Sequence, residues 1–159
     1  MTARIRAAER ADVHAIAELI RGLARYERLE DQVTMTEDML ETALFGPRPY
    51  AETLLAEEDG RPVGFALYFH NFSTFLAKPG IYLEDLYVIE AHRGKGIGRS
   101  LLARLAAVAV ERGCGRLEWA VLDWNADAIG FYESLRAMPN TDWTVYRLAG
   151  DSLAGLARE

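Results

Sequence analysis

The segment Ile81–Arg112, IYLEDLYVIEAHRGKGIGRSLLARLAAVAVER, decides how the rest of the chain is organised. Alternating side chains predict a strand that places two sets of residues on opposite sides: Tyr82, Leu86 and Val88, and Ile81, Leu83, Tyr87 and Ile89. A helix is predicted after the glycines, because apolar residues recur at helical spacing and two glycines follow: Ile97, Leu101, Leu105 and Val108, then Gly113 and Gly115. Strand, loop and helix start together predict an anion site.

The loop between the two elements reads Arg93-Gly94-Lys95-Gly96-Ile97-Gly98. The first turn of a helix leaves backbone N–H groups without partners and carries partial positive charge, so a phosphate is held there by several donors. Glycines let the backbone approach a bulky pyrophosphate, and they tolerate left-handed φ values. Arg93, Lys95 and Arg99 add positive charge. The alternative is a glycine-rich turn that only connects two elements.

Spacing excludes two familiar phosphate loops. A Walker-type loop requires Lys-Ser or Lys-Thr after the glycines, and the dinucleotide fingerprint requires glycine where Arg99 stands. The remaining pattern is R-x-x-G-x-G at Arg93, Gly96 and Gly98. It resembles the acetyl-CoA pyrophosphate loop of the GNAT N-acetyltransferase superfamily.

Further motifs resemble the spermidine/spermine (diamine) acetyltransferase branch, which includes the thialysine acetyltransferases. They occur in the expected order over nearly the whole chain: Leu23–Glu27, Gln32-Val33, Val63–Ala66, Tyr82–Asp85, Trp124-Asn125 and Phe131-Tyr132. The resemblance implies a single N-acetyltransferase domain over residues 1–159. It also implies a homodimer and an α/β fold, in which helices flank a mixed, mostly antiparallel sheet and a splayed central strand leads to the acetyl-CoA loop.

The resemblance also assigns residues to acetyl-CoA, which is expected as cosubstrate. The loop contributes Arg93, Gly94, Lys95, Gly96, Ile97, Gly98 and Arg99, and Asn125 adds a contact near the start of a later helix. Backbone N–H groups of Leu86, Tyr87 or Val88 are the expected oxyanion donors, provided that the strand is bulged there.

Acyl transfer to an amine also requires proton transfers. A primary amine with a pKa near 10.4 is neutral in about 1 molecule in 2,500 at pH 7, a deficit of roughly 4.6 kcal/mol. Glu84 resembles the carboxylate that removes this proton through ordered water, and Tyr132 resembles the acid that protonates the leaving thiolate. Tyr26, Glu27, Glu84 and Asp85 are the expected acceptor contacts. Read without the resemblance, Glu84-Asp85 is a charged strand end and Tyr132 a core residue.

Composition narrows the class of protein. A chain of 159 residues that is 50% hydrophobic can bury one sizeable core. A net charge of −6 disfavours nucleic acid as partner. The sequence has no apolar leader and no long apolar run, so we expect no membrane association and a cytoplasmic location. Cys114 is the single cysteine, so no internal disulfide can form, and we interpret it as an inert thiol. The three histidines lack metal-ligand spacing, so no metal is expected.

The remaining elements are predicted from periodicity and turn signals. Strands are expected at Ala3–Arg6, Ala51–Glu57, Pro62–Phe69, Leu117–Leu122 and Trp143–Leu148; helices at Asp12–Arg25, from Thr34 or Thr36 to Gly46, at Asn125–Leu135 and at Asp151–Ala157; and a loop at Asn71–Gly80. Thr34 with Glu37 has capping-box spacing. Arg136 stands where many relatives end the Tyr132 helix with glycine, and a left-handed helix end is costlier there.

The sequence therefore predicts an acetyl-CoA-dependent N-acetyltransferase that moves an acetyl group directly to a primary amine of a small molecule, such as a polyamine, diamine, thialysine or lysine-like compound. No residue is well placed to act as a nucleophile, so we expect direct transfer without a covalent enzyme intermediate. Two alternatives stay open: an acetyltransferase acting on a protein amine, and a non-catalytic acyl-CoA-binding or sensor module. A nucleotide-dependent enzyme is a more distant alternative.

Overall fold

The computed structural model describes residues 3–159. The strands are β1 (Arg4–Ala7), β2 (Glu52–Glu58), β3 (Arg61–Ser73), β4 (Lys78–Val88) and β5 (Leu117–Trp119). The helices are α1 (Val13–Glu27), α2 (Glu37–Phe45), α3 (Ile97–Glu111), α4 (Ala126–Ser134) and α5 (Gly150–Leu156), with short 3-10 turns η1 (Arg10–Asp12), η2 (Glu30–Gln32) and η3 (Glu90–His92).

The chain forms two compact units, one running through Leu122 and the other from Asp123 to the end. The first unit contains the sheet and helices α1 to α3, and the second contains α4 and α5. Each is described by itself. A single domain over residues 1–159 stays a prediction.

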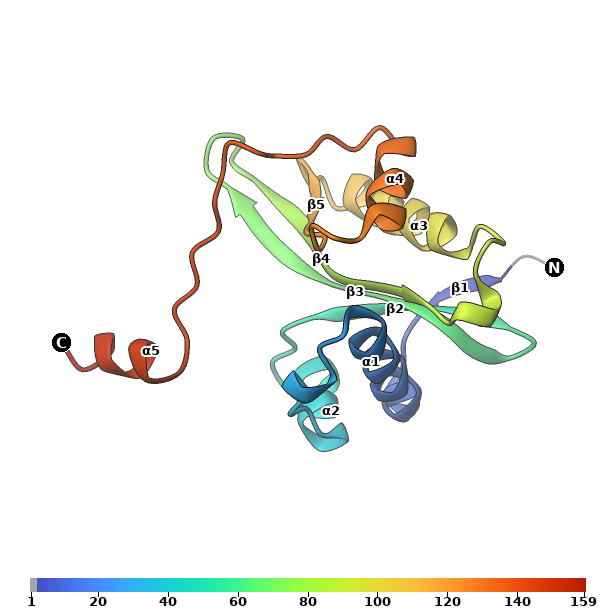
Figure 1. Ribbon diagram of the computed structural model, residues 1–159, viewed down its shortest axis with the longest axis horizontal. Helices are drawn as coiled ribbons and strands as arrows, with labels where there is room; N and C mark the ends of the chain where they lie inside the picture. Colours follow the sequence, from blue (N-terminus) through green and yellow to red (C-terminus); the bar gives the residue numbers. More distant parts are fainter. Residues whose placement is uncertain (1–2) are drawn as a thin grey trace. The chain divides into compact units, whose positions relative to one another are not determined.

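The sheet of the first unit has the order β1-β2-β3-β4-β5. Neighbouring strands from β1 to β4 pair antiparallel, and β5 pairs parallel with β4. Helices α1 and α2 lie on one face of this sheet and α3 lies on the other (Figure 1). The mixed, mostly antiparallel α/β architecture expected from the sequence is confirmed.

A bulge interrupts β4 at Glu84. Asp85 pairs with Leu67, but the next residue of β3, Tyr68, pairs with Leu83, so Glu84 is the extra residue. The alternation predicted for this strand is therefore wrong beyond the bulge. Because side chains opposite each other share a face, Ile81 and Leu83 lie on the same face as Leu86 and Val88, and Asp85 lies with Tyr87 on the face toward α1.

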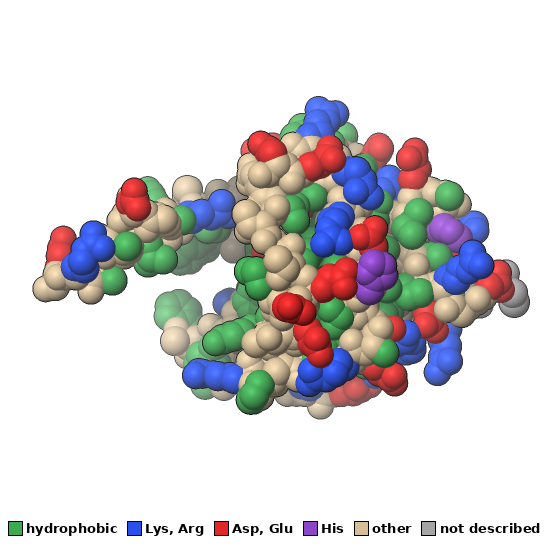
Figure 2. All heavy atoms as spheres, turned by 90° about the horizontal axis from the view of Figure 1, so that it is seen from below, with side chains coloured by type: hydrophobic (Ala, Val, Ile, Leu, Met, Phe, Trp, Pro, Cys, Tyr) green, Lys and Arg blue, Asp and Glu red, His purple; other side chains and the backbone are tan. Residues whose placement is uncertain are grey.

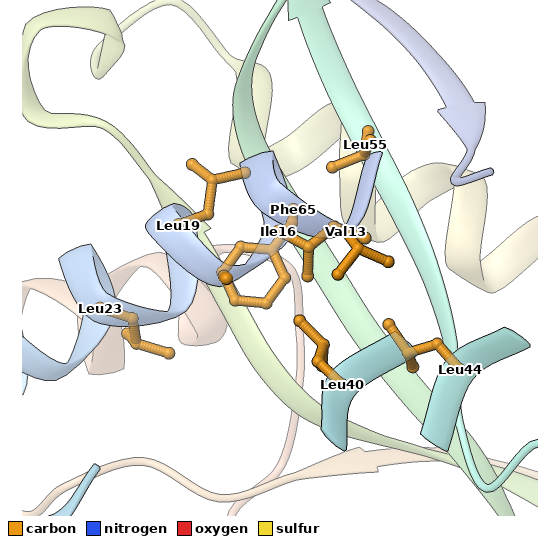
Figure 3. Packing of buried hydrophobic residues seen from close by; sticks show 9 residues of the cluster. Val13, Ile16, Leu19, Leu23, Leu40, Leu44, Leu55 and Phe65 are labelled. Atoms are coloured by element: carbon orange, nitrogen blue, oxygen red, sulfur yellow. The ribbon is translucent and has the colours of Figure 1, made fainter. Parts of the chain in front are cut away.

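The hydrophobic core on the α1 and α2 face explains why this layer forms. Ile16 of α1, Leu55 of β2 and Phe65 of β3 are fully buried, and their side chains point toward one another with those of the two helices (Figure 3). The cluster comprises Val13, Ile16, Ala17, Leu19, Leu23, Leu40, Leu44, Leu55 and Phe65. The other face is covered by the apolar stripe of α3 predicted from its spacing, in which Ile97, Leu101 and Leu105 are buried.

Local signals decide where the second helix begins. The Met39 N–H donates to Thr36 Oγ1 at 3.2 Å, so Thr36 is the N-cap of α2. The prediction of a capping box between Thr34 and Glu37 is wrong, because Glu37 is already the first helical residue.

Three other expectations differ from the structure. The loop expected at Asn71–Gly80 is mostly sheet, since β3 continues to Ser73 and β4 starts at Lys78. The strand expected at Leu117–Leu122 ends at Trp119, where its ladder with β4 ends. The strand expected at Trp143–Leu148 is wrong, because no ladder includes these residues in the described structure. A pattern that suits a pleated strand does not supply the neighbouring strand that the ladder requires.

Candidate active site

The start of α3 has the backbone geometry of an anion site. Gly94 and Gly96 adopt left-handed φ values of 78° and 81°, and Gly96 is the N-cap of the helix. The first intrahelical bond runs from Ser100 N to Gly96 O, so the N–H groups of Ile97, Gly98 and Arg99 precede the helical ladder. No atom lies within 4 Å of a Cβ built on either glycine, so the backbone is open to a ligand. This arrangement fits a pyrophosphate.

Two residues outside the predicted site hold this loop to the sheet. His92 Nδ1 lies 2.5 Å from Glu58 Oε2, and Lys95 Nζ lies 3.4 Å from the same oxygen. Glu58 is the last residue of β2, so the carboxylate ties the loop to the turn between β2 and β3. These two contacts lower the pKa of Glu58 below its ordinary value. The sequence carried no signal for this pairing, since Glu58 and His92 are 34 residues apart.

Arg93 extends its side chain toward α1. Its Nε donates to the Val88 carbonyl at 2.8 Å. Its Cζ lies 4.6 Å from the ring centroid of Tyr26 and 5.5 Å from that of Tyr87. Arg93, Lys95 and Arg99 are all exposed, but the Arg93 guanidinium is engaged by the Val88 carbonyl and the two rings.

The central strand is splayed next to the bulge. Its ladder with β5 covers only Ile81, Leu83 and the residue between them, which pair with Leu117–Trp119. Ile89 N donates to Val63 O, and bonded and non-bonded pairs alternate along an antiparallel ladder. Leu86 and Val88 therefore direct their N–H groups away from β3, past the end of the β5 ladder. Of the three expected oxyanion donors, these two point to the open side.

An acidic cluster lies on the α1 side of the bulge. Burial, reinforced by the charges of Glu84 and Glu27, raises the pKa of Asp85 to about 7. Burial also raises the pKa of Glu27, the last residue of α1. The structure thus brings together three of the four expected acceptor contacts, and Tyr26 precedes Glu27 on the same helix. A cationic ligand would relieve the repulsion among these carboxylates.

Glu84 is the exposed member of this cluster. Burial and then the Glu84 charge raise the pKa of Tyr82, whose ring packs against Phe69 with a centroid separation of 5.4 Å. The bulge thus gives two successive residues different surroundings, with Asp85 largely buried and Glu84 open to solvent.

The second unit holds the other two expected residues, Asn125 and Tyr132. The Ala128 N–H donates to Asn125 Oδ1 at 3.2 Å, which confirms Asn125 as the N-cap of α4. Tyr132 lies in the last turn beside Phe131, with ring centroids 5.5 Å apart. The helix ends in a left-handed residue, Arg136, at φ 65°. The Ala137 N–H then returns to the Tyr132 carbonyl at 3.2 Å.

Cys114 lies close to a histidine that the sequence did not place near it. Its Sγ is 3.9 Å from His70 Nδ1, and that nitrogen is 3.0 Å from the Gly80 carbonyl. His70 Nε2 accepts from Arg112 at 2.9 Å, because a guanidinium can only donate. The proton therefore resides on Nδ1, and the basic nitrogen is engaged by Arg112. His70 cannot take the thiol proton in this arrangement.

The described residues lack two further features. They contain no group of three His, Cys, Asp or Glu side chains that is placed to hold a metal ion. None of the described helices has the length and apolar character needed to cross a membrane.

A splayed mixed sheet that leads into an anion-binding loop, with carboxylates beside the splay, is the arrangement of a transferase that binds an acyl-CoA. Comparison with known proteins identifies the family. The Acetyltransferase (GNAT) family model matches residues 13–137. The chain belongs to this family and is an N-acetyltransferase, and the family implies acetyl-CoA as cosubstrate.

Two of the relatives match nearly the full length of the chain. Thialysine N-epsilon-acetyltransferase of Bos taurus is 40% identical over 96% of this chain and 96% of its own length. L-ornithine N5-acetyltransferase NATA1 of Arabidopsis thaliana is 34% identical over 98% and 88%. Among solved structures, an integron cassette protein from the mobile metagenome of V. cholerae has a TM-score of 0.84 and 29% identity, and the match covers 100% of this chain and 99% of that chain.

Proposed function

We propose that this protein transfers an acetyl group from acetyl-CoA directly to a primary amine of a small molecule of the polyamine, diamine, thialysine or lysine-like class. The observation that carries the proposal is the acidic cluster of Glu27, Glu84 and Asp85 beside the open edge of β4. A cationic amine bound there lies next to backbone N–H groups suited to the thioester oxygen. The named activities of the bovine and Arabidopsis relatives, which concern thialysine and ornithine, support the same substrate class.

Acetyl-CoA is assigned to the β4 edge and the loop after it. The N–H groups from Gly94 to Arg99 hold the pyrophosphate, with Lys95 and Arg99 supplying charge and Asn125 a further contact. Leu86 and Val88 present N–H groups to the acyl carbonyl and the adjoining pantetheine arm. Such donors stabilise the oxyanion because their orientation is fixed before the reaction.

Two carboxylates are assigned to the amine substrate, one to bind it and one to deprotonate it. Asp85 binds the cation, and Glu84, exposed at the bulge, removes a proton through water, after which the neutral nitrogen attacks the thioester carbon. A pKa of about 7 makes Asp85 a second candidate for the base, because a base works best when its pKa lies near the working pH. Comparing the pH–rate profiles of Glu84→Gln and Asp85→Asn separates the two roles.

Tyr132 is assigned to the departing thiolate. Collapse of the tetrahedral intermediate breaks the C–S bond, and the phenol donates its proton to sulfur, since a phenol is protonated at neutral pH. The extra proton on the attacking nitrogen is then released and restores the Tyr132 phenol, which leaves a neutral amide. Tyr132→Phe removes only the hydroxyl. It lowers kcat and leaves the dissociation constant of acetyl-CoA unchanged, if the hydroxyl acts on the leaving group alone.

We further propose that the protein is a cytoplasmic homodimer without nucleic-acid or membrane partners. The single cysteine suits a reducing compartment. Acidic and basic side chains are interspersed over the face seen in Figure 2, whereas nucleic-acid binding uses concentrated basic patches. Exposed apolar side chains at Met138, Trp143, Val145 and Tyr146 support self-association.

The test of the activity is a thiol-release screen with acetyl-CoA. Spermidine, putrescine, ornithine, thialysine and lysine are compared with a lysine-containing peptide and a peptide with a free N-terminus. Release of free CoA thiol with the small amines supports the proposal. Faster release with the peptides favours a protein amine as acceptor. Binding of acetyl-CoA without thiol release from any amine indicates a sensor module.

A further inference from the structure

The Arg93 guanidinium joins three elements of the first unit. Arg93 directly follows η3 and opens the glycine loop. Its Cζ lies 4.6 Å from the Tyr26 ring on α1 and 5.5 Å from the Tyr87 ring on β4. A guanidinium at such distances over aromatic faces is held by cation–π attraction, and its planar shape suits stacking. The first residue of the cofactor loop is thereby fixed to the helix end that carries Glu27.

The Tyr87 ring is itself held in place by α1. A Cβ built on Gly22 would lie 2.9 Å from both Tyr87 Oη and Tyr87 Cε1, a distance that real Cβ atoms do not adopt. The ring therefore packs directly on the helix backbone at a position where only glycine leaves room. Tyr26 lies one helical turn beyond Gly22, so both residues are on the same face of α1. That face contacts the Tyr87 ring at Gly22 and offers Arg93 a second aromatic ring at Tyr26.

Arg93 also donates a hydrogen bond to the open edge of β4. The Val88 carbonyl points in the same direction as the Val88 N–H, away from β3 and past the end of the β5 ladder. Arg93 Nε donates to that carbonyl at 2.8 Å. The guanidinium is thus bonded to the same peptide edge whose N–H groups are assigned to the acyl carbonyl.

We infer that Arg93 is a positioning residue that couples the acceptor end of α1 to the acetyl-CoA loop and the β4 edge, and that Tyr26 acts through it. The inference rests on the proposed function of that loop. Loss of the Tyr26 ring, on the acceptor side, then weakens coenzyme A binding at the loop. Loss of the guanidinium in turn raises KM for the amine.

The competing role for Arg93 is a direct ion pair with a phosphate of acetyl-CoA. The two roles differ in what replaces arginine. A lysine keeps the charge for a phosphate, but it lacks the Nε donor and the planar face. If Arg93 is a positioning residue, Arg93→Lys weakens coenzyme A binding as much as Arg93→Met does. If Arg93 pairs directly with a phosphate, Arg93→Lys retains most of the affinity for coenzyme A.

The experiment measures coenzyme A dissociation constants by calorimetry for the full chain and its variants. We expect Tyr26→Leu to weaken binding roughly two- to fivefold, the range of one exposed cation–π contact. Arg93→Met and Arg93→Lys are expected to weaken it at least as much, because they also lose the bond to the Val88 carbonyl. The double variant Tyr26→Leu/Arg93→Met is expected to bind no more weakly than Arg93→Met, because Tyr26 acts only through the guanidinium that Arg93→Met already removes. Tyr26→Phe, which keeps the ring, restores wild-type affinity.

Controls separate failure of this inference from failure of the proposed function. Arg104→Met removes an exposed arginine of α3 that pairs with Glu111, and it leaves coenzyme A binding unchanged. Thermal melts verify that each variant is folded. Two results with a wild-type protein that binds coenzyme A would overturn the positioning role. One is that the effects of Tyr26→Leu and Arg93→Met on the free energy of binding are additive in the double variant. The other is that Arg93→Lys retains the wild-type affinity. If wild-type protein does not bind coenzyme A, the function proposed for the loop is wrong.

Discussion

The Glu58 carboxylate accepts a hydrogen bond from His92 Nδ1 at 2.5 Å, and so fixes the segment before the glycine loop to the end of β2. The same oxygen lies 3.4 Å from Lys95 Nζ inside the loop. One carboxylate therefore holds two points of the loop that is proposed to bind the pyrophosphate. Preorganisation of this kind lowers the entropy that binding must otherwise overcome.

Glu58→Gln is accordingly expected to weaken acetyl-CoA binding. The amide cannot form a charge-assisted bond to His92 or attract Lys95, so the loop is held less firmly. We expect a several-fold rise in the dissociation constant measured by calorimetry, with a smaller change in kcat. Glu111→Gln, which removes an exposed carboxylate paired with Arg104, is the matched control. An unchanged dissociation constant for Glu58→Gln would show that the loop keeps its shape without this anchor.

Gly96→Ala and Gly60→Ala form a matched pair that separates strain from ligand exclusion. The two glycines have φ values of 81° and 75°, and a Cβ on either meets nothing within 4 Å. Both substitutions are therefore expected to cost about 1–2 kcal/mol of stability, measured by denaturant unfolding. Only Gly96→Ala places a methyl group at the anion site, so only it is expected to abolish or strongly weaken acetyl-CoA binding. Equal binding by both variants would contradict the assignment of the loop.

Asp85 predicts a pH dependence of substrate binding. Its pKa of about 7 in the folded protein means that the carboxylate forms as the pH rises through neutrality. The KM for the cationic amine is therefore expected to fall between pH 6 and pH 8 in wild-type protein. Asp85→Asn removes this dependence and raises KM at pH 8. If Asp85→Asn showed the same fall in KM as wild-type protein, the titrating group would lie elsewhere.

The raised pKa of Asp85 also predicts that the folded protein loses stability as the pH rises, although substrate binding improves over the same range. Because its pKa rises from 3.8 in the unfolded chain to about 7, the folded state holds the extra proton between these values, and stability falls as the pH rises through that range. Above pH 7 the loss is constant, with an upper limit of about 4 kcal/mol at 1.36 kcal/mol per pKa unit. Asp85→Asn is thus expected to raise Tm at pH 8. The gain should vanish near pH 4, as followed by thermal denaturation at both pH values.

The sequence predicted the parts of this molecule that depend on local chemistry. The R-x-x-G-x-G spacing predicted a loop whose backbone has the geometry of an anion site, Asn125 was recognised as a helix cap, and the alternation of Val63, Phe65 and Leu67 identified a strand. Long-range contacts were not accessible in this way. Nothing near Glu58 in sequence signals His92, and nothing near Tyr26 signals Arg93. The family resemblance implied a splayed central strand but did not place a bulge at Glu84, because a register shift depends on the partner strand β3 and leaves no mark on the alternating residues of β4.

Arg136 was recognised from the sequence as an unusual helix end, and the structure gives it a left-handed φ of 65°. A non-glycine residue in that conformation costs roughly 1–2 kcal/mol, and the greater unfolded-state entropy of glycine offsets about half of this. Arg136→Gly is therefore expected to stabilise the protein by about 1 kcal/mol, a rise in Tm of roughly 2–4 °C. Arg136→Ala removes the same side chain without relieving the backbone and is expected to give no gain. A gain with alanine would point to the arginine side chain instead.

The segment after α4 supports the proposed homodimer and gives its test. Met138, Trp143, Val145 and Tyr146 are 77–93% exposed although all four are apolar or aromatic. An aromatic side chain buries roughly 150–250 Å² when it is covered, so a partner surface that packs on these residues removes a large apolar area from water. We expect a dimer in analytical ultracentrifugation at micromolar concentration and a shift toward monomer for Trp143→Ser/Tyr146→Ser. Phe75→Ser, at a fully exposed aromatic in the turn between β3 and β4, is the matched control and should sediment as wild-type protein. A monomeric wild-type protein, or equal dissociation of both variants, would remove this segment as the dimer contact.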